Sequence, residues 1–186
     1  AIRSSGNMYN QSLVSSLISN NGVANTEAWA NRFVGNFARK PEGNDRAQIM
    51  AVANGEADIA IANSYYIGLM LSGKKGDEQR AAARKVNLHF PSQAGRGAHI
   101  NVSGVGLMKN SPNKANAVKF IEFLLSDKAQ EHIVNNTYEY PLSANVAPSD
   151  LIAQFGTGFK EDQTSVADYG KFNPEAVKLM DRVGWQ

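Results

Sequence analysis

The sequence contains no cysteine among its 186 residues, and this absence excludes several kinds of chemistry. Without thiols the chain forms no disulfide, has no thiolate nucleophile and cannot supply cysteine ligands to zinc or to an iron–sulfur cluster. It has three histidines, and no HExxH or other metal-ligand spacing joins them. A nucleophile elbow and a Walker A sequence are also absent. The sequence therefore predicts a protein that is not an enzyme.

Charge of one sign and long apolar runs are also scarce. The 19 basic and 17 acidic side chains leave a formal charge of +2, and no five like charges follow one another. So small a surplus argues against a nucleic-acid partner or a membrane-surface protein. No stretch approaches the roughly 18 apolar residues that a membrane helix needs. The first residues do not form a signal peptide, because Arg3 is charged and no apolar segment follows it.

Hydrophobic residues make up 42% of the chain, and in its first half they alternate between helical and extended patterns. The first helix is predicted over 7–20, and a second one follows an Asn25-Thr26 cap. A third is predicted over 45–55 with Asp45 as its cap, and two shorter helices are predicted over 65–71 and 77–85. Short apolar runs predict buried strands at 58–62 and 87–90. This order of elements predicts an α/β fold with a mostly parallel sheet.

The second half opens with two extended runs at 99–103 and 105–108. A clearly amphipathic helix is predicted over 114–125, and Ser126 caps the helix that follows. The tail is rich in loops until Pro174. This proline is predicted to start the last helix, because proline suits the first helical position.

The first candidate site is the turn Ser4-Ser5-Gly6-Asn7, which lies directly before a predicted helix. Free N–H groups and the helix dipole make such a helix start suitable for an anion. Serine and asparagine are also the favoured residues of an ordinary helix cap. The local sequence leaves both interpretations open.

The second candidate site is the pair Tyr65-Tyr66, which follows a predicted strand and Asn63. Ligands gather at the carboxyl ends of parallel strands, and Tyr9 occupies an equivalent position near the first predicted helix. Phenolate oxygen is a hard, anionic donor that suits Fe³⁺, and this ion is acidic enough to deprotonate a phenol near neutral pH. Neighbouring tyrosines can equally be half core and half surface. Periodicity alone does not separate these two interpretations.

Long stretches of the sequence are similar to one known family. They are RSSGNMYNQSLVSSL from Arg3, GNDRAQIMAVANGEADIAIANSYYIG from Gly43, FPSQAGRGAHINVSGVGLMKNSPNKANAVKFIEFLLS from Phe90, EYPLSANV from Glu139 and NPEAVKLMDRVGW from Asn173. Through them the chain resembles the periplasmic ferric-ion-binding proteins, the substrate-binding components of bacterial iron(III) ABC importers. The resemblance covers practically the whole chain.

The resemblance implies roles for particular residues. Family members bind iron through a tyrosine pair that follows a strand, which corresponds to Tyr65 and Tyr66. In the branch with a GNxYNQ turn the tyrosine of that turn is a third ligand, which corresponds to Tyr9. The family also implies a synergistic anion such as carbonate or phosphate, for which the Ser4–Asn7 turn is the candidate here. Asn63 matches a position that helps the site in some members.

The family fold is of the type II periplasmic-binding-protein kind, with two α/β lobes joined by crossing strands and the ion in the cleft between them. It implies that 1–97 and 147–186 build the tyrosine-bearing lobe, which is largely complete here. Residues 98–146 would cross to the other lobe, most of which is missing. The apolar face of the predicted helix over 114–125 would then need a cover: the missing N-terminal fragment, a second copy of the chain, or the remaining lobe if the segment repacks onto it.

The resemblance implies a carrier that binds ferric iron in the periplasm and delivers it to an ABC permease at the inner membrane. One alternative is a binding protein of the same fold for an anion or another metal, in which the tyrosines are only aromatic residues of the cleft. Another is an enzyme or a sensor domain built on the same lobes, because a fold alone does not fix function.

Overall fold

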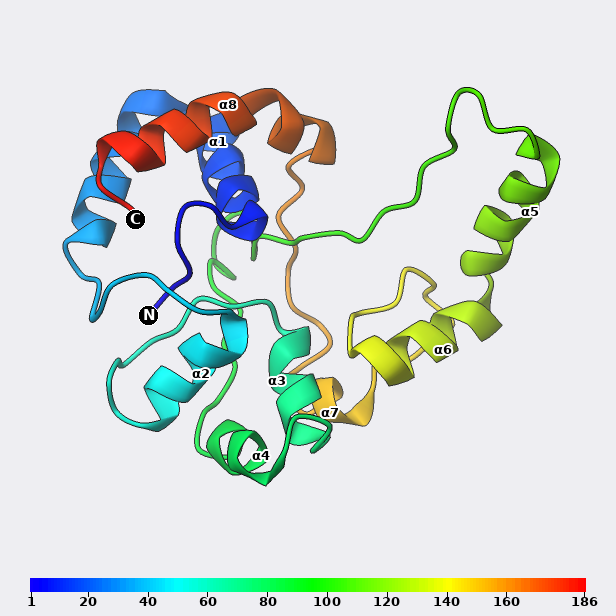
Figure 1. Ribbon diagram of the computed structural model, residues 1–186, viewed down its shortest axis with the longest axis horizontal. Coiled ribbons are helices and arrows are strands. Elements are labelled where there is room, and N and C mark those ends of the chain that lie inside the picture. The colour runs from blue at the N-terminus through cyan, green and yellow to red at the C-terminus, as the bar shows by residue number, and fades with distance from the viewer.

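Eight helices form the regular structure of residues 1–186, all of which the computed structural model describes (Figure 1). In chain order they are α1 (Met8–Val34), α2 (Asp45–Ala53), α3 (Tyr65–Leu71), α4 (Asp77–Ala83), α5 (Lys114–Leu124), α6 (Asp127–Thr137), α7 (Asp150–Ala153) and α8 (Val166–Arg182). None of these helices combines the length and the apolar character needed to cross a membrane.

The helices predicted in the first half are present, with corrections at their boundaries. The two helices expected on either side of Gly22 are joined as α1, which is interrupted by the non-helical backbone of that glycine (φ 76°). Asn44 caps α2 in place of Asp45, because the Asn44 side chain accepts a hydrogen bond from the N–H of Ala47. Asp45 is therefore the first helical residue, and its carboxylate is free to bond elsewhere.

The last helix begins before Pro174, so its predicted start is wrong. Ser165 caps α8 by accepting a hydrogen bond from the N–H of Ala167, and Pro174 lies inside the helix. A proline in a helix interior removes one backbone hydrogen bond. The helix continues past it because Leu179 and Met180 are fully buried against α1, which runs beside α8 (Figure 1).

The predicted strands are not formed, and the chain has a single parallel bridge, between Ala98 and Glu161. A strand needs a neighbour whose backbone pairs with its own N–H and C=O groups. The 58–62 segment meets only Ala1, which exchanges two hydrogen bonds with it. The chain supplies no further pairing segment. The strand predictions, at 58–62, 87–90, 99–103 and 105–108, are therefore wrong for this chain.

Two hydrophobic clusters pack the molecule. The first lies between α1 and α8 and includes Val14, Ile18, Leu179, Met180 and Trp185. The second joins α2, α3, α4 and α7 and includes Ile49, Ile67, Met70, Ala83 and Ile152. The indole N–H of Trp185 donates to the carbonyl oxygen of Arg3 at 3.0 Å, which ties the N-terminal segment to the first cluster.

Helix α5 lies apart from both clusters (Figure 1). Residues 102–110, which lead to it, are exposed, and α5 itself has no buried residue. The chain returns to the second cluster at Tyr138, directly after α6. Gly68 of α3 makes room for this residue, since a Cβ at Gly68 would lie 2.8 Å from the Cβ of Tyr138. The end of the segment predicted to cross to another lobe, 98–146, thus packs on the same body as α3.

Candidate metal centre

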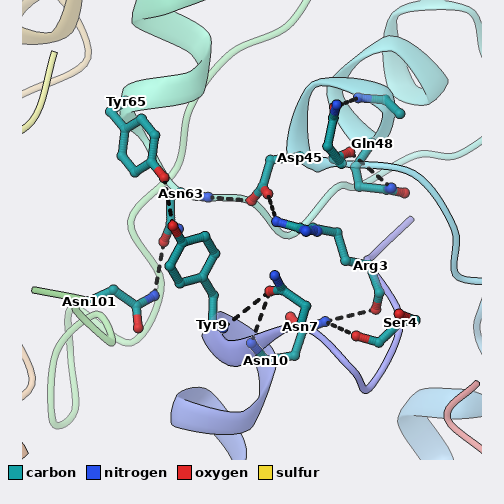
Figure 2. Close-up of polar contacts among 12 residues, drawn as sticks. Arg3, Ser4, Asn7, Tyr9, Asn10, Asp45, Gln48, Asn63, Tyr65 and Asn101 are labelled. Atoms are coloured by element: carbon teal, nitrogen blue, oxygen red, sulfur yellow. Dashed lines mark hydrogen bonds and ion pairs between the residues drawn. The ribbon is translucent and has the colours of Figure 1, made fainter. Parts of the chain in front are cut away.

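Three tyrosines meet where the start of α1 faces the start of α3. Figure 2 shows two of them, Tyr9 and Tyr65. The hydroxyl oxygens of Tyr9 and Tyr65 are 3.1 Å apart and share a hydrogen bond. The rings of Tyr65 and Tyr66 lie against each other, with centroids 4.3 Å apart. All three side chains are partly buried. The fold therefore brings together tyrosines from two turns that lie far apart in the sequence.

The position of Tyr9 is set by the cap of α1. The side-chain oxygen of Asn7 accepts hydrogen bonds from the N–H groups of Tyr9 and Asn10. The buried Asn10 amide in turn donates to the carbonyl oxygens of Arg3 (2.7 Å) and Ser4 (3.0 Å). These bonds hold the N-terminal turn against the first turn of α1 and so fix the position of the Tyr9 backbone.

A buried carboxylate, that of Asp45, joins the two tyrosine-bearing turns (Figure 2). Its Oδ2 pairs with Nη1 of Arg3 at 2.7 Å, in the turn that precedes Tyr9. Its Oδ1 accepts a hydrogen bond of 3.2 Å from the N–H of Asn63, in the turn that precedes Tyr65. The side chain of Asp45 is 4% exposed. Removing either member of so buried a pair would leave an uncompensated charge.

A second polar connection runs through Asn101. Its amide group donates to Oδ1 of Asn63 at 2.9 Å, and its oxygen accepts a hydrogen bond from the hydroxyl of Ser12. The Ser12 oxygen also lies 2.9 Å from the carbonyl oxygen of Tyr9 and 3.2 Å from Nε2 of His99. A chain of polar contacts therefore links the turn before Tyr65 to the first turns of α1.

Comparison with known proteins identifies the family. The family model of bacterial extracellular solute-binding proteins matches residues 5–131. The chain belongs to this family. Iron uptake protein A1 of Synechocystis sp. is 51% identical over 185 residues, which cover 100% of this chain and 51% of that protein. The major ferric iron-binding protein of Neisseria meningitidis is 36% identical over 107 residues, 58% of this chain and 31% of that protein.

A solved structure is similar to this chain over the whole length of the chain. The structure from Trichodesmium, in complex with iron and citrate ligands, matches with a TM-score of 0.96 and 52% identity and covers 100% of this chain and 58% of that one. The predicted family resemblance and the predicted fold class are therefore confirmed. The chain spans about half the length of the curated relatives Iron uptake proteins A1 and A2, so it contains part of the solute-binding-protein fold.

Burial sets the protonation of the pair Tyr65 and Tyr66. It raises the pKa of Tyr65 well above the usual value, and the neighbouring hydroxyls of Tyr66 and Tyr9 raise that pKa further. Burial also raises the pKa of Tyr66, with opposing effects from its charged neighbours Asp45 and Arg3. Both phenols are therefore neutral near pH 7, and a cation that binds their oxygens must displace protons.

The donors available to a metal at this site are phenol oxygens. The structure has no group of three histidine, cysteine, aspartate or glutamate side chains that could hold a metal ion. Two oxygens bound to one hard cation at about 2 Å each, at right angles, lie about 3 Å apart. The separation of 3.1 Å between the Tyr9 and Tyr65 oxygens matches that spacing. Once deprotonated, the tyrosines can chelate a hard cation such as Fe³⁺.

The turn predicted as an anion site serves as a helix cap. Asn7 already accepts from the first N–H groups of α1, and the carbonyl oxygen of Ser5 accepts from the side-chain amide of Gln11 at 3.0 Å. Gly6 is exposed and Ser4 is partly buried. The other predicted residue, Asn63, has a buried side-chain nitrogen without a hydrogen-bond partner.

The sequence did not single out the residues that hold the tyrosine-bearing turns in place. Ser12 and Asn101 lie 89 positions apart, and no local pattern connects them. Asp45 was predicted as a helix cap. Gln48 and Ile49 follow Asp45 by three and four residues, so all three lie on one face of α2, and this face is buried. A carboxylate on such a face needs a partner, and this spacing is the signal that could have identified Asp45.

Proposed function

We propose that this protein binds ferric iron through Tyr9, Tyr65 and Tyr66 and delivers it to an ABC permease at the inner membrane. It acts in the periplasm as a carrier and performs no chemical turnover. Membership of the extracellular solute-binding family supports the transport role and the location. The names of its relatives, an iron uptake protein and a ferric iron-binding protein, support the cargo.

The meeting of the tyrosine hydroxyls is the observation that carries the proposal. The oxygens of Tyr9 and Tyr65 are 3.1 Å apart, and the ring of Tyr66 lies against that of Tyr65. Phenolates are hard oxygen donors, and hard cations of high charge prefer such ligands.

A synergistic anion completes the coordination in this proposal. Three tyrosinate oxygens leave positions open on a cation that takes about six oxygen ligands. The candidate partners of the anion are Ser4, Ser5, Gly6, Asn7 and Asn63. The unpartnered side-chain nitrogen of Asn63 supports this role, because a buried donor gains from an added acceptor. Citrate accompanies iron in the Trichodesmium structure, and carbonate and phosphate offer the same oxygen chemistry.

The lobes form part of the same proposal. Residues 1–97 and 147–186 belong to the tyrosine-bearing lobe, and 98–146 cross to a second lobe that closes over the iron. The separation of α5 from both hydrophobic clusters supports such a crossing. The packing of Tyr138 in the second cluster favours an end of the crossing segment before 147.

A titration of the full-length protein with a ferric chelate at neutral pH, followed by visible absorbance, tests the proposal. A tyrosinate–Fe³⁺ complex is coloured. Replacing Tyr9, Tyr65 or Tyr66 with Phe removes the ligand oxygen and keeps the ring. Each variant should therefore lose colour and bind iron more weakly. The loss of affinity should exceed the roughly tenfold loss that is typical when a residue supporting a ligand is removed.

Tyr140→Phe is the matched control, because Tyr140 packs at the second cluster and its hydroxyl donates to the carbonyl oxygen of Gly156 at 2.9 Å, outside the tyrosine site. This variant should bind iron and develop colour as the parent does. If the three site variants also match the parent, the ferric proposal is wrong. The anion-binding alternative at the Ser4–Asn7 turn would then lead.

A further inference from the structure

Asn101 stands where the chain leaves the packed body of the molecule. Just before it, Ala98 pairs with the backbone at 160–162 in the only bridge of the structure: Ala98 N–H donates to Lys160 O, and Asp162 N–H donates to Ala98 O, each at 2.8 Å. Just after it, residues 102–110 are exposed. Asn101 is partly buried. It is therefore the last partly buried residue before the exposed stretch that leads to α5.

The side chain of Asn101 bonds to both tyrosine-bearing turns at once. Figure 2 shows its bond to Asn63. Its nitrogen donates to Oδ1 of Asn63, two residues before Tyr65, at 2.9 Å. Its oxygen accepts the hydroxyl proton of Ser12, which lies three residues after Tyr9 in α1. One amide thus uses its donor toward one turn and its acceptor toward the other.

His99 also contacts this network. The Ser12 hydroxyl has one proton and two oxygen acceptors, the Asn101 oxygen and the Tyr9 carbonyl oxygen at 2.9 Å, so Nε2 of His99 at 3.2 Å is the donor to the Ser12 oxygen. Nδ1 of His99 is then a bare acceptor, and it is buried without a partner. His99 therefore contacts the same Ser12 hydroxyl that bonds to Asn101.

We propose that Asn101 is a positioning residue of the tyrosine site: its amide holds the Tyr9 turn and the Tyr65–Tyr66 turn at a fixed separation. This inference rests on the proposed function, in which the tyrosine oxygens chelate iron. Residues that hydrogen-bond to the segments carrying metal ligands affect the affinity for the metal, because ligand oxygens that are displaced by a few tenths of an ångström bind it less tightly. Without Asn101, the two turns keep the Asp45 connection and the hydrogen bond between the Tyr9 and Tyr65 hydroxyls, and the second of these is lost when the oxygens bind a metal.

The test measures the affinity of the full-length protein for ferric iron, supplied as a chelate, and the position of the visible absorption band. Asn101→Ala should weaken iron binding about 10- to 100-fold and shift or weaken the band. Asn101→Asp has the same shape and keeps an acceptor for Ser12. Rotation of the Asn63 amide lets its nitrogen, which has no partner in the parent, donate to the second oxygen, so this variant should bind iron more tightly than Asn101→Ala.

Asn20→Ala is the matched control. The Asn20 amide also links α1 to the partner segment of the bridge, by donating to Ser16 O (2.8 Å) and to the Thr164 hydroxyl (2.7 Å), and it does not touch the tyrosine-bearing turns. It should leave affinity and colour unchanged. Parental affinity in Asn101→Ala, or equal losses in Asn101→Ala, Asn101→Asp and Asn20→Ala, would overturn the inference while leaving the ferric proposal intact. A parent protein that binds no iron would overturn both.

Discussion

The imidazole of His99 is kept neutral by its surroundings. Burial lowers its pKa to about 4, and the nearby carboxylate of Asp162 opposes this effect only in part. In the unfolded chain a histidine has a pKa of about 6.5. Between these two values the unfolded state binds a proton that the folded state does not. The free energy of unfolding therefore falls as the pH is lowered from about 6.5 to 4, and the loss is complete below that range.

We expect His99→Gln to reduce this pH dependence. Between pH 7 and pH 4.5 the histidine should cost the parent about 2 kcal/mol of stability, because its pKa is lower in the folded than in the unfolded state. The measurement is urea unfolding of the parent and the variant at both pH values. His132→Gln, at an exposed histidine, is the control and should retain the parental slope. An unchanged slope in His99→Gln would show that His99 is not the group responsible.

At the scale of single elements, the approach of two backbone segments at Gly97 requires a glycine. Gly97 has a φ of +101°, and a Cβ there would lie 2.6 Å from the carbonyl carbon and oxygen of Glu161. Both the left-handed backbone and the contact exclude a larger residue. This glycine lets the 98–101 segment run beside the backbone at 161–162, immediately before the residues that reach the tyrosine site.

Gly97→Ala should destabilise the fold more than Gly76→Ala. Gly76 also has a positive φ, of +93°, and a Cβ there would have no atom within 4 Å. Both variants incur the backbone strain of about 1–3 kcal/mol, and Gly97→Ala adds an overpacking cost of similar size. Urea unfolding of the two variants isolates this second cost. Equal losses of stability would contradict the close approach at Glu161.

The helices could be predicted from the sequence because their signals are local. Apolar spacing and the cap at Ser126 mark α6, and α3 begins and ends where its apolar run does. The strands failed for a different reason. An apolar run such as 58–62 indicates that the segment could belong to a sheet, but a strand forms only beside another segment whose backbone pairs with it. Ala1 is the only neighbour that this chain provides for that segment.

Of the residues that build the candidate site, the tyrosines could be predicted from the sequence and the residues that hold them in place could not. Tyr65 and Tyr66 stand out because they are adjacent and follow an apolar run. The amide of Asn101 and the carboxylate of Asp45 are set by contacts across long sequence separations, which no local pattern records. The turn at Asn7 fitted both a cap and an anion site, and its side chain caps α1.

For the molecule as a whole, the apolar face of α5 is only partly covered in this chain. Phe120 is 58% exposed and Phe123 is 52% exposed, and Val118 and Leu125 are exposed beside them. The sequence predicts that this face needs a cover, and of its large apolar side chains only Ile121 and Leu124 are partly buried. The chain spans 58% of the Trichodesmium structure that it matches. Exposed apolar surface of this kind promotes association.

Replacing Phe120 and Phe123 together with Ser should reduce self-association of the 186-residue chain. The reason is that the pair removes most of the aromatic surface from the face while α5 keeps its other residues. Sedimentation velocity over a range of concentrations measures the effect. Leu142→Ser is the control, because Leu142 is a single exposed apolar side chain. Self-association that persists unchanged in the double variant would show that another surface is responsible.

Resonance Raman spectroscopy of the iron-loaded, full-length protein, excited within its visible band, tests the central claim most directly. Vibrations of a tyrosine ring are enhanced only when its oxygen is bonded to the absorbing metal. The account predicts strong tyrosinate modes that weaken in Tyr9→Phe, Tyr65→Phe and Tyr66→Phe and stay unchanged in Tyr140→Phe. An iron-loaded protein without tyrosinate modes would contradict it.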